Sequence, residues 1–132
     1  MNLYLDIDGV LLDTKHQKVP DGGKEFIEFA VSNFSCHWLT THCQGDSRRA
    51  IDYLSNYYSS RTIELLKTIQ PTKWNTLKTE AIDFTQPFVW LDDYVFQSEM
   101  DILHENRTED SLILVNLDSP NELRNLMVSL QV

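Results

Sequence analysis

The sequence contains little cysteine, glycine or proline. Its only cysteines are Cys36 and Cys43, with no second pair to complete a zinc site, so we expect buried or loop thiols and no structural disulfide. Glycine and proline are scarce, at four residues each, and no Gly/Ser-rich linker or low-complexity tract interrupts the chain. Because 42% of its 132 residues are hydrophobic, the chain is predicted to form a single domain spanning residues 1–132.

Long hydrophobic runs are also missing. No stretch approaches the roughly 18 consecutive apolar residues that indicate a membrane-spanning helix. The N-terminal segment is a strand-like pattern interrupted by polar residues and lacks the charged, then apolar, then small-residue pattern of a secretory leader. We therefore expect a soluble, cytoplasmic protein with no membrane partner.

Positive charge is in short supply, with 11 basic residues against 20 acidic ones and a formal net charge of −9. Long-range repulsion opposes non-specific binding of such a chain to nucleic acid or to anionic lipid. Nucleic acid is therefore not favoured as a partner. A cluster of acids that binds a metal would contribute to the same count, so a phosphorylated substrate is not excluded.

Segments typical of strands alternate with segments typical of helices along the whole chain. Short apolar runs predict the strands, and apolar residues at helical spacing predict the helices. Either Asp46 or Ser47 is expected to cap the second helix. The alternation implies right-handed crossovers and a mostly parallel sheet, an α/β doubly wound (Rossmann-like) fold with helices on both faces. The predicted strands are 2–7, 36–40, 87–91 and 111–115, and the predicted helices are 22–34, 47–58, 61–69, 75–84, 97–105 and 120–130.

Polar residues stand where several of these strands end. Asp6 and Asp8 precede Gly9 at the end of the first strand, and Asp92 and Asp93 end the third. Clustered carboxylates repel one another and are costly to desolvate, so their convergence needs a cation, and hard oxygen ligands suit Mg²⁺. Ligands of doubly wound sheets bind beyond the carboxyl ends of the strands. The candidate site residues at strand ends are Asp6, Asp8, Thr40, Thr41, Asp92 and Asp93.

Four sequence motifs together suggest a family. The segment DIDGVLLD at 6–13 resembles the first motif of haloacid dehalogenase (HAD) phosphatases, which is Asp, any residue, Asp, Gly, Val or Thr, Leu. The segment WLTTH at 38–42 is similar to the second motif, a strand ending in Thr or Ser. Lys78 and the segment WLDD at 90–93 fit the third and fourth motifs, a lysine followed by an acidic strand end. The four occur in the family's order and cover nearly the whole chain.

The resemblance implies hydrolysis of phosphate monoesters through an aspartyl-phosphate. Asp6 would be the nucleophile, and Asp8, two residues further along an extended strand, would be the acid and base. Thr40 would bind the transferring phosphoryl group, and Lys78 would offset the charge on Asp6 and the phosphate. The implied Mg²⁺ ligands are Asp6, the backbone carbonyl of Asp8, Asp92 and Asp93.

Two of these roles have alternatives within the sequence. Thr41 replaces Thr40 if the second strand ends one residue later. Lys73 or Lys67 could replace Lys78, which is preferred for its spacing ahead of the fourth motif.

Two further residues are candidates for holding an anionic substrate. His42 and Arg48 follow the second motif and could bring positive charge to the site, although a solvated surface role is equally consistent with the sequence. The division of metal ligation between Asp92 and Asp93 stays open.

The gaps between the motifs are too short for an inserted cap domain, so the chain resembles the capless branch of the family. An open site suits a bulky substrate, such as a phosphoprotein or a nucleic-acid end, or needs a second chain to cover it. A phosphatase is the favoured function. The alternatives are a HAD-fold binding or regulatory module with little turnover and a phosphotransferase to an acceptor other than water. Dehalogenation is disfavoured because that branch lacks an acid at the position of Asp8.

Overall fold

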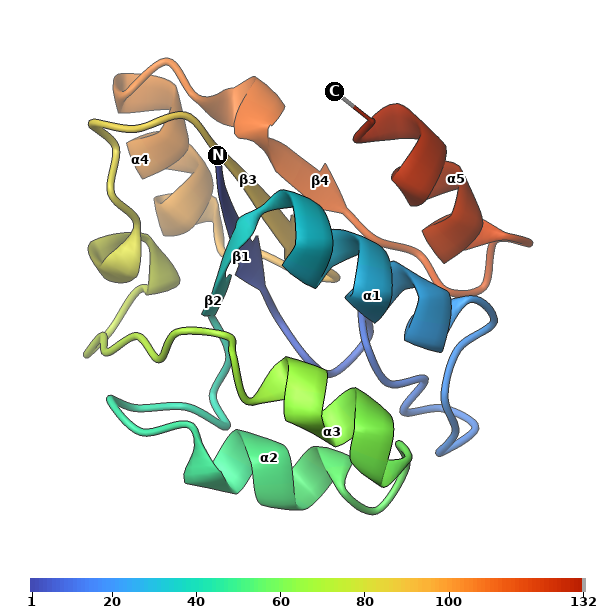
Figure 1. Ribbon diagram of the computed structural model, residues 1–132. Coiled ribbons are helices and arrows are strands. Elements are labelled where there is room, and N and C mark those ends of the chain that lie inside the picture. Colours follow the sequence, from blue (N-terminus) through green and yellow to red (C-terminus); the bar gives the residue numbers. More distant parts are fainter. Residues whose placement is uncertain (132) are drawn as a thin grey trace.

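The computed structural model describes residues 1–131 and contains one open, four-stranded sheet (Figure 1). All three strand pairings are parallel. Each strand therefore reaches the next through a crossover connection. The predicted α/β class with a parallel sheet is confirmed. The strands are β1 (Asn2–Leu5), β2 (Ser35–Trp38), β3 (Phe88–Asp92) and β4 (Leu112–Leu114), in the order β2-β1-β3-β4.

The central strand β1 shows why the molecule has a core on each side of the sheet. Successive side chains of a strand point to opposite faces. Leu3 and Leu5 belong to the larger of two buried clusters, whereas Tyr4, between them, belongs to the smaller one. A strand covered on both faces is apolar throughout, which is the pattern that predicted this strand.

Helices cover both faces, as predicted. Helices α1, α2, α3 and α5 contribute to the larger cluster, and α4 contributes to the smaller one beside the turn η1 (Lys78–Ala81). None of the helices within residues 1–131 is long and apolar enough to cross a membrane. The helices are α1 (Gly23–Asn33), α2 (Arg48–Leu54), α3 (Ser60–Leu66), α4 (Gln97–Glu105) and α5 (Glu122–Ser129), with a second short turn, η2 (Glu109–Ser111).

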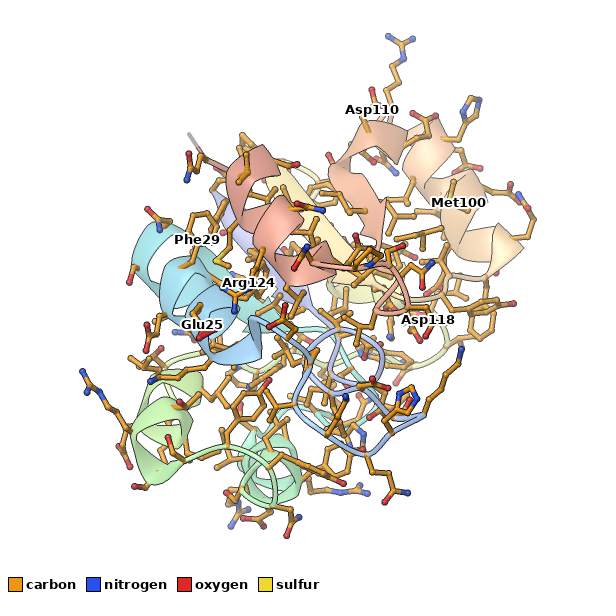
Figure 2. The ribbon with its side chains drawn as sticks, turned by 90° about the vertical axis from the view of Figure 1, so that its right-hand side faces the viewer. Glu25, Phe29, Met100, Asp110, Asp118 and Arg124 are labelled. Carbon is orange, nitrogen blue, oxygen red and sulfur yellow. The ribbon has the colours of Figure 1, made fainter. Side chains whose placement is uncertain are left out.

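Helix α5 docks against α1 through buried leucines and an exposed ion pair. Leu123 and Leu126 are buried in the larger cluster. The Arg124 guanidinium lies 3.2 Å from Asp21 Oδ1 and 3.9 Å from Glu25 Oε2 of α1 (Figure 2). Because ion pairs this exposed contribute little, burial of the leucines is the main source of docking energy.

The predicted helix at 75–84 is wrong, because only the single 3-10 turn η1 forms there. The Glu80 carboxylate accepts hydrogen bonds from the backbone N–H groups of Asn75, Thr76 and Leu77, at 3.2, 3.0 and 2.8 Å. A side chain that binds the backbone in this way competes with helical hydrogen bonding. The turn begins at Lys78, the lysine that was matched to the third motif.

The strand order creates one switch point. Within the sheet, β2 lies next to β1 on one side, and β3 and β4 lie on the other side of β1. In open α/β sheets, ligands bind at the carboxyl ends of the strands where the order reverses. Here that position is the crevice beyond β1 and β3.

Candidate active site

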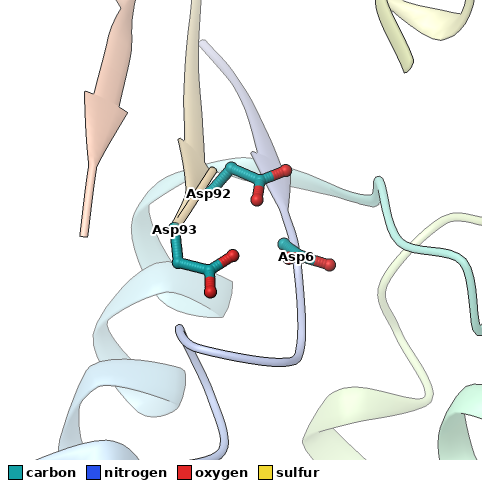
Figure 3. A group of neighbouring side chains, drawn as sticks. All are labelled: Asp6, Asp92 and Asp93. Atoms are coloured by element: carbon teal, nitrogen blue, oxygen red, sulfur yellow. The ribbon is translucent and has the colours of Figure 1, made fainter. Parts of the chain in front are cut away.

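Three carboxylates converge at the switch point. Asp6 follows β1, Asp92 is the last residue of β3, and Asp93 comes next (Figure 3). One oxygen from each carboxylate lies within 4.8 Å of the other two. The parallel register pairs Leu5 with Leu91, which brings Asp6 and Asp92 side by side. Asp6 and Asp92 are buried, whereas Asp93 is exposed.

Lys78 is the cation that faces this cluster. Its Nζ lies 2.7 Å from Asp92 Oδ2 and 3.5 Å from Asp6 Oδ1. Its backbone N–H donates to the buried carboxylate of Glu99 on α4, at 2.8 Å, which fixes the turn above the strand ends. Burial disfavours the ammonium, but the charges of Asp6 and Asp92 outweigh that effect and raise the pKa of Lys78. Lys78 therefore stays positively charged.

The cluster has more negative than positive charge. Burial, and then the charge of Asp92, raise the pKa of Asp6 to about 8, although Lys78 opposes the change. The pKa of Asp93 is also raised, first by partial desolvation of its carboxylate and then by its hydrogen bond with Asp92. Three oxygen donors of this kind could hold a divalent cation, which would supply the missing positive charge.

The first turn after β1 approaches the cluster closely. Gly9 has φ +82°, and a Cβ at this position would lie 2.2 Å from Asp93 Oδ2. A side chain at position 9 would therefore force Asp93 to move as well as strain the backbone. Position 9 thus needs a residue without a side chain, because the Asp93 carboxylate occupies the adjacent space.

Asp8 stands outside the carboxylate cluster and has partners of its own. Tyr53 of α2 donates its hydroxyl to Asp8 Oδ1 at 2.8 Å, and His42 Nε2 lies 2.9 Å from Asp8 Oδ2. The His42 and Tyr53 rings stack, with centroids 4.2 Å apart. Burial, and then the bond to Asp8, raise the pKa of Tyr53 to about 12, so its hydroxyl remains a donor. The sequence did not identify Tyr53, which has only the helical spacing of α2 as a signal.

A cavity of about 370 Å³ opens at the cluster. Thr41 lines it, whereas Thr40 is fully buried and accepts a hydrogen bond from the His42 backbone N–H at 3.2 Å. The structure thus brings Thr41, and not Thr40, to the cavity. His42 is likewise absent from the described lining and is directed to Asp8 instead. The lining includes Asp6, Thr41, Lys78 and the aromatic side chains of Trp74, Tyr94 and Phe96.

Arg48 does not join the site, contrary to the expectation that it holds substrate. Its guanidinium pairs with Asp46 at 2.7 Å, and it lines a different cavity together with Lys67. Ser47 is the N-cap residue of α2 but makes no capping hydrogen bond with its side chain, whereas the Asp46 carboxylate, one residue earlier, accepts the Arg48 backbone N–H at 2.8 Å. Neither Lys67 nor Lys73 is among the described residues that line the cavity at the cluster, which leaves Lys78 in the position expected of the third motif.

Comparison with protein-family models, curated proteins and solved structures gives no match. The functional conclusion therefore rests on the motifs and on the geometry. The site combines a buried carboxylate beside a lysine, two neighbouring carboxylates able to hold a cation, and a separate carboxylate held by two side chains.

Proposed function

We propose that this protein is a Mg²⁺-dependent phosphomonoester phosphatase of the HAD type, without a cap domain. The observation that carries the proposal is the convergence of Asp6, Lys78, Asp92 and Asp93, from distant parts of the sequence, at the switch point of the sheet. A purely structural ion-pair network would balance its charges. Here three carboxylates share one lysine, an arrangement that is costly without a bound cation.

Asp6 is the nucleophile in this proposal. One of its carboxylate oxygens attacks the phosphorus, the bond from phosphorus to the leaving oxygen breaks, and an aspartyl-phosphate forms. Lys78, 3.5 Å from Asp6 Oδ1, offsets the charge that gathers on the nucleophile and the phosphoryl oxygens. Asp6, Asp92 and Asp93 would hold Mg²⁺, which would supply further positive charge for phosphoryl transfer.

Asp8 acts as acid and then as base. It gives a proton to the leaving oxygen, and later it removes a proton from the water that attacks the phosphorus and releases inorganic phosphate from Asp6. Tyr53 and His42 hold its carboxylate through both oxygens. Thr41, which lines the cavity, is the hydroxyl donor to the phosphoryl group.

Release of 4-nitrophenol from 4-nitrophenyl phosphate tests the proposal. We expect turnover with Mg²⁺ and none with EDTA, and we expect Asp6→Asn to abolish it. Asp101→Asn, at an exposed position of α4, is the matched control and should keep wild-type activity. Activity that survives in Asp6→Asn would exclude this nucleophile. A wild type that hydrolyses neither this ester nor a panel of phosphorylated metabolites would favour a binding or regulatory role.

A further inference from the structure

Two aromatic side chains beside the carboxylate cluster are exposed. Tyr94 is 66% and Phe96 is 52% exposed, although both line the same cavity as Asp6. Their rings lie 5.7 Å apart in an edge-to-face arrangement. Trp74 also lines this cavity, and we call Trp74, Tyr94 and Phe96 the aromatic shelf. Exposed aromatic surface at a site is available to stack against a planar ligand.

The loop that carries Tyr94 and Phe96, two of the three residues of the shelf, is fixed at both ends. The Tyr94 backbone N–H donates to Asp92 Oδ1 at 3.2 Å, and the Phe96 backbone N–H donates to Glu99 Oε1 at 2.9 Å. Glu99 is buried and also binds the backbone of Lys78. One buried carboxylate therefore positions both Lys78 and the loop with Tyr94 and Phe96, so these two aromatic side chains and the cluster keep a fixed relation.

We propose that the aromatic shelf binds the base of a nucleoside monophosphate whose phosphate is hydrolysed at Asp6, an inference that rests on the proposed function. The cavity, at about 370 Å³, is within the range of small-molecule sites. Bases stack on aromatic side chains without need of a specific hydrogen-bonding edge. The phosphate then lies at the carboxylate and lysine end and the base at the aromatic end.

Charge favours a mononucleotide over a longer strand. Lys78 is the one basic residue among the described residues that line the cavity. Arg48, the first residue of α2, is paired with Asp46 and lines a different cavity. Each further phosphate of a polynucleotide needs a basic partner, and a chain of net charge −9 repels it.

Adenosine 5′-monophosphate and ribose 5-phosphate form the test pair, because both release a 5′-alkoxide and the nucleotide adds the base. We expect kcat/KM of the wild type to be about tenfold or more higher for the nucleotide. Tyr94→Ala and Phe96→Ala should each lower kcat/KM for the nucleotide much more than for ribose 5-phosphate, so that most of the preference is lost. Val128→Ala, at a 70% exposed apolar position on α5, should change neither rate.

The outcomes separate this inference from the proposed function. Equal kcat/KM for the two esters, or a preference retained in both shelf variants, overturns the shelf and leaves the phosphatase intact. A higher kcat/KM for phosphotyrosine or for a 5′-phosphorylated oligonucleotide overturns the nucleoside monophosphate as the ligand. If neither ester is hydrolysed, calorimetric titration of Asp6→Asn decides. Tighter binding of the nucleotide than of ribose 5-phosphate, lost when Tyr94→Ala is added, supports the shelf although the proposed phosphatase activity fails. Equal binding of the two esters overturns the shelf.

Discussion

Asp8 is held by two side chains that lie 34 and 45 residues away in the sequence. With both oxygens engaged, its carboxylate has one orientation relative to Asp6. General acid catalysis depends on such positioning, because the proton must be delivered along the bond that breaks. In the proposed mechanism Tyr53 and His42 are therefore positioning residues, which act through Asp8.

Tyr53→Phe tests this positioning, because it keeps the ring that stacks on His42 and removes only the hydroxyl. We expect kcat/KM to fall about 10- to 100-fold for an alkyl phosphate, whose leaving oxygen needs the proton, and to change little for 4-nitrophenyl phosphate. Tyr57→Phe is the control, because its ring lies 6.0 Å from that of Tyr53. Equal losses with the two esters would indicate a merely structural role for the Tyr53 hydroxyl.

At the level of single residues, the sequence could predict the positions that strand ends determine. Asp6 and the Asp92–Asp93 pair end apolar strands, so their convergence is a consequence of a parallel sheet. Tyr53 could not be predicted, because its contact depends on how α2 packs. Arg48 was predicted to bind substrate but lies outside the site, because Asp46, two residues earlier in the chain, binds its guanidinium.

The turn after β1 lies against the carboxylate cluster. Gly9 and Gly45 both have left-handed backbone angles, at φ +82° and +81°. A Cβ at Gly9 would collide with Asp93, whereas at Gly45 the nearest contact is Lys73 Cδ at 3.8 Å. The two glycines thus share the backbone requirement and differ in what surrounds them.

Gly9→Ala should therefore displace Asp93, and we expect a higher Mg²⁺ concentration for half-maximal activity together with a lower free energy of unfolding. Gly45→Ala should lower the free energy of unfolding by only about 1–2 kcal/mol, the cost of the left-handed conformation, and should keep the wild-type Mg²⁺ requirement. Activity as a function of Mg²⁺ concentration, with denaturant unfolding of each variant, checks both. An unchanged Mg²⁺ requirement in Gly9→Ala would show that Asp93 is not a ligand.

Helices and strands were predictable to the extent that local pattern decides them. The predicted helix at 97–105 has the bounds of α4, because its apolar spacing agrees with its packing. The predicted helix at 47–58 is wrong in its length, since α2 ends at Leu54, and the next helix begins where the Ser59 hydroxyl accepts the Thr62 backbone N–H. Side-chain hydrogen bonds to the backbone override propensity at such boundaries, as they do at η1.

At the scale of the whole molecule, the carboxylate cluster makes stability depend on pH. The pKa of Asp6 is about 8 in the folded protein, against about 3.9 for an unfolded aspartate. Between these values the folded state binds the additional proton, so stability falls as pH rises from about 4 to 8. Mg²⁺, by binding the folded state, should offset the loss.

Urea unfolding in EDTA checks this dependence. We expect the wild type to lose on the order of a few kcal/mol between pH 4 and 8 relative to Asp6→Asn, which has no charge to develop at this position. Asp6→Asn should therefore be the more stable protein at pH 8 without metal. A difference between the two proteins that does not change with pH would contradict the charge balance described for the cluster.

The class of fold was predictable from the alternation of strands and helices, but the strand order was not. Placing β1 between β2 and β3 depends on which apolar faces pack together, and it is this order that puts the switch point beside Asp6.

The central claim is that Asp6 becomes phosphorylated, and mass spectrometry of acid-quenched protein tests it most directly. Quenching at short times after mixing with Mg²⁺ and 4-nitrophenyl phosphate should reveal one phosphoryl group on the peptide that contains Asp6. More should accumulate in Asp8→Asn, which lacks the base for the second step, and none should form in Asp6→Asn. Turnover with no phosphoryl group on Asp6 at any quench time, or with the group on another residue, would contradict the proposed mechanism.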